Sequence, residues 1–129
     1  MNVSATWSTK SNSLSGAIGN LAAKAAARVA ANIYNEAVKI SPVLTGSYRA
    51  SWRMAAGSMD MSISKGGAVG SPMAAPAEAS PLKIVVGQSI FVSNATPYAY
   101  RLEYGWSKQA PSGILRISVA AALRRSGYV

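Results

Sequence analysis

Two reactive residue types are missing from this chain, because its 129 residues include no cysteine and no histidine. The lack of cysteine excludes disulfides and thiolate chemistry. The lack of histidine removes the commonest general base and the commonest metal ligand of proteins. Acidic residues are also scarce, since only Glu36, Asp60, Glu78 and Glu103 occur, in four separate segments. We therefore expect no catalytic site, no metal site and no cofactor.

Two patterns could still carry chemistry. A Ser–Lys pair built on Lys65 or Lys83 stays formally open, although a surface lysine is the simpler interpretation and no G-x-S-x-G pattern occurs. The glycine cluster at 66–70 resembles a phosphate-binding loop, but no apolar strand precedes it and no helical pattern follows it. The sequence thus predicts a protein that is not an enzyme and has no small-molecule substrate.

Long apolar runs are absent too. No stretch approaches the roughly 20 apolar residues that span a bilayer, and the first residues show neither the basic region nor the apolar region of a signal peptide. We expect a soluble protein without membrane contact. Half of the residues are apolar, but only one is phenylalanine and many are alanine. This composition predicts a small core, for which packing against sister copies would add buried area.

Positive charge is abundant. Thirteen Lys and Arg residues against four acidic ones give a net charge of +9, which favours a polyanionic partner or an acidic protein surface. The basic residues are spread along the chain and form no dense run. The residues expected to face DNA or an acidic partner are Lys24, Arg28, Arg49, Arg53, Arg124 and Arg125.

The first strong pattern is a row of apolar residues at helical spacing. Its members are Leu14, Ile18, Leu21, Ala25, Val29, Ile33, Ala37 and Ile40. The row predicts a helix of about 27 residues and roughly 40 Å, which Ser41-Pro42 ends. A helix of this length exceeds the average, so part of it should contact something else. Residues 1–12, before the helix, are polar and are expected to form a flexible tail.

The rest of the single domain, 1–129, is predicted in order. Residues 47–54 alternate as in a half-buried strand, with a short helical start as the alternative, and residues 55–81 form a flexible arm. Residues 82–86 and 89–93 form two short strands or one bulged strand. Thr96 caps a short helix with Pro97 at its first position, Gly105 ends that helix with a positive φ, and a last apolar helix follows. The expected fold class is α+β, with the long helix packed on a small antiparallel sheet.

Two groups of residues resemble a known family. The first consists of Ile90 to Asn94, Pro97-Tyr98-Ala99, Leu102-Glu103-Tyr104-Gly105 and Gln109-Ala110-Pro111 before an apolar helix. The second consists of Ser41-Pro42-Val43, Thr45-Gly46 and Arg49-Ala50-Ser51-Trp52. Together, and in this order, they are similar to the tail-completion or head-to-tail joining (neck) proteins of tailed bacteriophages, a group of minor tail proteins.

The resemblance implies a structural virion protein, assembled in the host cytoplasm, that forms a homohexameric ring at the head–tail junction. Its implied partners are its own copies and the other neck and tail proteins: head stopper, terminator and tail tube. Non-specific contact with genomic DNA in the channel would use the positive charge. Two alternatives stay open: a tail terminator that caps the tube, and a small basic DNA-binding domain.

The candidate interface or motif residues follow from these segments. They are Trp52, Tyr98, Tyr100, Glu103, Tyr104, Gly105, Trp106 and Pro111. We expect about half of the aromatic residues between 98 and 106 in the core and the others at a subunit interface. Glu103 is expected to pair with an arginine, within the subunit or across the ring.

Overall fold

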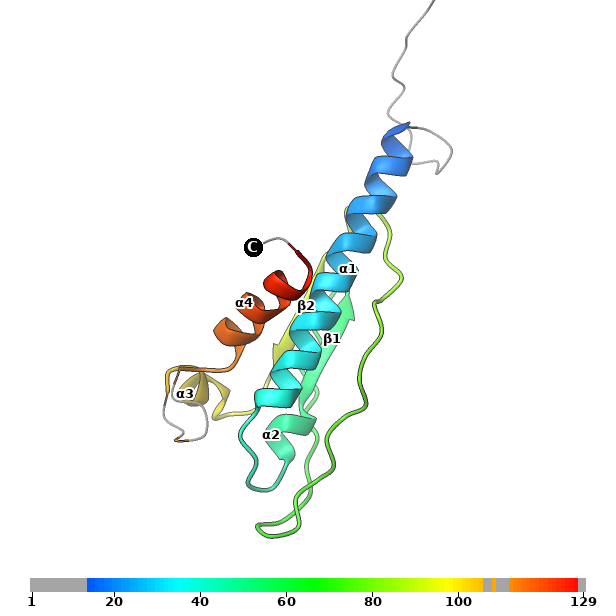
Figure 1. Cartoon of the computed structure of the whole chain (residues 1–129). Coiled ribbons are helices and arrows are strands. Elements are labelled where there is room, and N and C mark those ends of the chain that lie inside the picture. Colours follow the sequence, from blue (N-terminus) through cyan, green and yellow to red (C-terminus); the bar gives the residue numbers. More distant parts are fainter. Residues whose placement is uncertain (1–13, 106–107, 109–111, 128–129) are drawn as a thin grey trace, which may run out of the picture.

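The computed structural model describes residues 14–105, 108 and 112–127, and it has the predicted α+β architecture (Figure 1). Its elements are α1 (Leu14–Ile40), α2 (Ser47–Ala50), β1 (Trp52–Ala56), β2 (Ile90–Asn94), α3 (Ala99–Glu103) and α4 (Leu115–Arg125). The two strands pair antiparallel, from Trp52 opposite Asn94 to Ala56 opposite Ile90. A two-stranded sheet is marginal alone, so its stability depends on packing against α1.

Helix α1 has the predicted length and end. The chain leaves the helix at Ser41, whose hydroxyl donates a hydrogen bond to the Ala37 carbonyl and accepts one from Trp52 Nε1 at 2.7 Å. These two bonds tie the end of α1 to the start of β1. The core forms around this point, and its buried cluster is Tyr34, Ala37, Val38, Tyr48, Trp52 and Ile114.

The face of α1 that is buried differs from the row of apolar residues in the sequence. The buried apolar residues of α1 are Ala27, Ala30, Ala31, Tyr34, Ala37 and Val38. Of the eight residues in the predicted row, only Ala37 is buried, and Leu14, Ile18 and Leu21 are 78%, 55% and 68% exposed. Alanine lets the sheet and α4 approach the helix closely. The larger side chains of the first turns lie roughly half a turn away from this alanine face.

Residues 47–54 are not one strand: they form helix α2 followed by β1. Ser51 Oγ donates to the Ser47 carbonyl at 2.6 Å, and the Ser51 amide donates to the Tyr48 carbonyl at 3.1 Å. The alternating pattern led to the prediction of a strand because residues four apart share a face in both a helix and a strand. Tyr48 and Trp52 do share one, with ring centroids 5.8 Å apart.

Residues 82–86 are not a strand either, so β2 stands alone opposite β1. Val86 packs on Gly19 of α1, where an added Cβ would lie only 2.7 Å from a Val86 methyl group. The segment thus lies along the helix, and a turn at Gly87, with φ of 86°, separates it from β2. Val86 thus contacts the helix instead of pairing in a β-ladder, and Val85 is 70% exposed.

The arm begins after β1 and has no helix or strand up to residue 81, apart from a single bridge between Ala68 and Ser71. Hydrogen bonds attach it to the body. The Met73 amide donates to the Thr45 carbonyl at 2.8 Å, and the Asn35 side chain both donates to and accepts from the Ala79 backbone, at 3.0 and 2.8 Å. Figure 1 shows the arm running along α1. Its flexibility stays a prediction.

The short helix α3 begins later than expected, at Ala99. Thr96 does not cap it, because its hydroxyl donates to Asn94 Oδ1 at 2.7 Å, and Tyr98 occupies the cap position without a side-chain bond. The predicted positive φ of Gly105 is confirmed, at 83°. No helix in the described residues is long and apolar enough to cross a membrane.

Candidate functional site

Glu103 joins α3 to α4 and is the most connected of the candidate residues. Its Oε2 accepts the amides of Ile114 and Leu115 at 3.0 and 2.7 Å, and its Oε1 accepts both the amide and the Nε of Arg116 at 3.1 Å. The predicted pairing with an arginine is confirmed, within the chain. The sequence did not reveal that the same carboxylate caps α4, whose own cap residue makes no side-chain bond.

The environment of Glu103 favours its charged form. Burial raises the pKa of this carboxyl group, but the three amides and the Arg116 guanidinium lower it, and together they bring the pKa below its ordinary value. A negative charge at the first turn of α4 also interacts favourably with the helix dipole. Glu103 is therefore a structural anion that positions α4.

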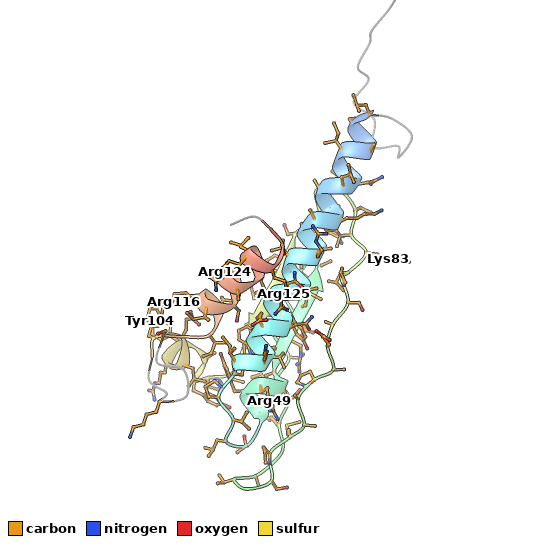
Figure 2. All side chains as sticks on the ribbon, viewed as in Figure 1. Arg49, Lys83, Tyr104, Arg116, Arg124 and Arg125 are labelled. Atoms are coloured by element: carbon orange, nitrogen blue, oxygen red, sulfur yellow. The ribbon has the colours of Figure 1, made fainter. Side chains whose placement is uncertain are left out.

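The tyrosines of the candidate segment lie at the surface. Tyr100 and Tyr104 are 73% and 59% exposed, their ring centroids are 4.6 Å apart, and the Arg116 guanidinium lies 5.6 Å from the Tyr104 ring (Figure 2). Tyr98 is also exposed. We expected about half of the four aromatic residues between 98 and 106 in the core. The three tyrosines among them are exposed, so this expectation is wrong.

Trp52, a candidate interface or motif residue, is only 3% exposed and packs in the core, so it is not at an interface. It belongs to the buried aromatic residues, together with Tyr34 and Tyr48, and offers no surface to a partner. Trp106 and Pro111 lie outside the described residues.

An apolar groove is a feature that the sequence did not reveal. It has a volume of about 570 Å³ and is formed by α1, β2 and α4. Its lining residues are Ala25, Ala26, Val29, Ala30, Ile33, Ile90, Val92, Leu115 and Val119, none of them charged. On α1 the row that enters this groove continues outward through Leu21, Ile18 and Leu14, on the turns that project beyond the sheet and α4 (Figure 1).

The six candidate cations have different environments. Arg49 donates to the Met73 carbonyl of the arm at 2.8 Å, Arg53 donates to Ser62 and Ser64 at 2.8 Å, and Arg125 forms an ion pair with Glu36. The side chains of these three residues are therefore engaged in contacts within the chain, Arg49 and Arg53 with the arm and Arg125 with α1. Lys24 and Arg28 instead line a hollow of about 510 Å³ between α1 and residues 81–84, to which Lys83 contributes.

The last of the six, Arg124, is exposed near the end of α4 (Figure 2). It lies on the same helix as Arg116 and Arg125, on the side of α1 away from Lys83. The structure thus leaves Lys24, Arg28 and Arg124 available from the predicted set, and these lie on two different sides of α1. No single basic face collects all six candidates.

The described residues show no arrangement that suits a Ser–Lys pair or a phosphate-binding loop. Ser62 with Lys65 and Ser80 with Lys83 have S-x-x-K spacing, which brings two side chains to one face only in a helix, and both pairs lie in irregular backbone. Residues 66–70 likewise precede no helix. Within the described ranges, no three acidic side chains come together as a metal site would require.

Comparison of the chain with protein-family models, with curated proteins and with solved structures finds no match.

Proposed function

We propose that this chain is a structural protein of a tailed phage that forms a ring, of six copies, at the head–tail junction and joins the tail to the head. The observation that carries the proposal is the extent of uncovered apolar surface. The groove between α1, β2 and α4 and the exposed row from Leu14 to Leu21 form one apolar strip. On a single copy such a strip is characteristic of a protein–protein contact site.

The residue census supports the same conclusion. The chain has no cysteine or histidine, and its best-connected carboxylate, Glu103, is engaged in capping a helix. Tyr100 and Tyr104 add an exposed aromatic pair of the type that is enriched at interfaces. The two sequence segments that resemble neck proteins supply the location in the virion.

The test is association with virion components. The purified chain is expected to form a ring of defined mass in sedimentation-velocity experiments, and to bind separately purified head-stopper or tail-tube proteins of its own phage. A density map of the virion neck would locate the ring and separate a joining ring from a terminator on the tube. A chain that stays monomeric at about 1 mM and binds none of these proteins would refute the proposal.

A second function, non-specific DNA binding, is favoured by the hollow that Lys24, Arg28 and Lys83 share. Phosphate contacts release counterions, so affinity falls steeply with salt, by about 0.9 in the slope of log K against log salt for each neutralised phosphate. Replacing these three residues with glutamine should reduce that slope by about three. A slope that the triple variant leaves unchanged would count against DNA binding at this hollow.

A further inference from the structure

The projecting end of α1 and the apolar groove are two parts of one molecule with matching chemistry. The end is a helical ridge formed by Leu14, Ile18 and Leu21, all exposed. The groove is a hollow with an apolar lining and an open side. An amphipathic helix laid into an apolar groove is a common mode of protein recognition. The ridge adjoins the groove along α1, but it lies on turns that project beyond the sheet and α4 (Figure 1).

We propose that the ridge of one copy (Leu14, Ile18 and Leu21) inserts into the groove of the next copy, which is the contact that builds the ring. In this arrangement each copy offers its ridge to one neighbour and its groove to the other, and such a head-to-tail contact repeats until the ring closes. A closed dimer of the unmodified chain, in which two copies exchange ridges, would overturn it. This inference rests on the proposed function, and it adds the identity of the two surfaces.

Charge favours a second copy as the occupant. Each copy carries a net charge of +9, so most of its surface repels another copy. The first ten residues of α1 contain no charged side chain, and the lining of the groove contains none either. Both surfaces are therefore uncharged, although the protein as a whole is basic. Contact between them does not oppose like charges. A strongly acidic or basic partner would find no complementary charge in the groove.

The size of the contact predicts weak pairs and persistent rings. Ten helical residues span about 15 Å, and a helix is about 10 Å wide, so the ridge covers much less than the roughly 800 Å² per partner of a stable pair. A closed ring adds a second contact to every subunit, and the last contact forms within one assembly at high effective concentration. We expect few dimers and an abrupt transition from monomer to ring as concentration rises.

Two single variants test the contact. Leu21→Glu puts a charge on the ridge, and Ala26→Glu puts one at an exposed position of the groove, so neither change affects the buried core. Each variant should weaken self-association by roughly tenfold or more, as for a central interface residue. The matched controls, Asn20→Glu on α1 and Ala120→Glu on α4, are exposed and lie outside the ridge and the lining, and they should assemble like the unmodified chain.

Mixing the two variants gives the decisive result. The Ala26→Glu chain keeps an intact ridge and the Leu21→Glu chain keeps an intact groove, so an equimolar mixture should form a one-to-one dimer and nothing larger. The chain contains no cysteine, so a single designed disulfide can trap that dimer for mass measurement. Leu14→Cys is added to the Ala26→Glu chain, and Val119→Cys is added to the Leu21→Glu chain. Circular dichroism melting of every variant confirms that each one is folded.

The other outcomes overturn the inference. If Leu21→Glu assembles like the unmodified chain, the ridge is not the contact, while the ring and the proposed function stand. A mixture that stays monomeric, where the unmodified chain forms rings, excludes a head-to-tail contact of these surfaces. If the full chain is monomeric at about 1 mM but a chain without residues 1–12 associates, that segment occupies the groove. If neither associates, binding to neck proteins decides the proposed function separately.

Discussion

Replacement of Glu103 by glutamine separates the charge of this residue from its shape. The carboxylate accepts three backbone amides and one guanidinium N–H. Glutamine keeps one oxygen, which can still accept the amides of Ile114 and Leu115. Its NH₂ group replaces Oε1 and cannot accept the two N–H groups that Arg116 donates there. Hydrogen bonds to a charged group contribute about 1.5–3 kcal/mol and neutral ones about 0.5–1.5 kcal/mol. The helix-dipole contribution of about 0.3–1 kcal/mol is lost as well.

The net effect of Glu103→Gln should be a loss of about 1–2 kcal/mol in the free energy of unfolding. For a domain of this size that corresponds to a decrease in Tm of about 4–8 °C. Thermal denaturation at pH 7, followed by circular dichroism at 222 nm, measures it. The matched control is Glu78→Gln, the same chemical change at an exposed carboxyl group, which should alter Tm little.

The pH dependence of the difference tests the reason behind it. The folded chain lowers the pKa of Glu103 below its ordinary value of 4.5, so its contribution is complete above 4.5 and is lost as the pH falls through the folded-state pKa. The two proteins should therefore converge in stability in the acid range below 4.5. An equal Tm at pH 7, or a difference that persists unchanged in acid, would refute the assignment of Glu103 as a charged helix cap.

Three further substitutions address the tertiary contacts. Trp52→Phe keeps a six-membered aromatic ring in the core but removes the five-membered ring with its hydrogen bond to Ser41 Oγ. Urea unfolding should show a loss of about 1–3 kcal/mol from the lost bond, with a further loss from the removed volume; an unchanged midpoint would mean that this bond contributes nothing. Gly46→Ala and Gly70→Ala both strain a positive φ by about 1–2 kcal/mol, but the new Cβ at Gly46 meets the Met73 backbone at 2.6 Å and that at Gly70 meets nothing within 4 Å. Gly46→Ala should therefore be clearly the less stable of the two, and equal losses would show that the arm does not pack at Gly46.

The sequence was most informative where a local rule acts alone. The apolar row and Ser41-Pro42 were enough for both ends of α1, and Gly105 was recognised from its place after a short helix. The row did not reveal which face of α1 is buried, because alanine carries little hydrophobic weight but permits close packing. The strand predicted at 82–86 failed for a tertiary reason, since Val86 contacts Gly19 of α1.

The candidate surfaces were less accessible to sequence analysis, because they depend on segments distant in the chain. The groove combines residues of α1, β2 and α4. Glu103 was recognised as a partner for an arginine, but its capping of α4 depends on how the chain returns after α3. Arg49 and Arg53 were counted as surface charges because their carbonyl and hydroxyl partners lie in the arm, which has no regular pattern.

The ion pair between Glu36 and Arg125 has a consequence for folding during synthesis. It joins α1 to α4, and a hydrogen bond from Asn32 to Ser126 at 3.1 Å reinforces it. About 75 residues separate the two helices, and translation at roughly 5–20 residues per second needs about 4–15 s to supply them. Throughout that interval the alanine face of α1 lacks the helix that covers it. Completion of the core therefore has to wait until α4 has left the ribosome, long after α1 has been made.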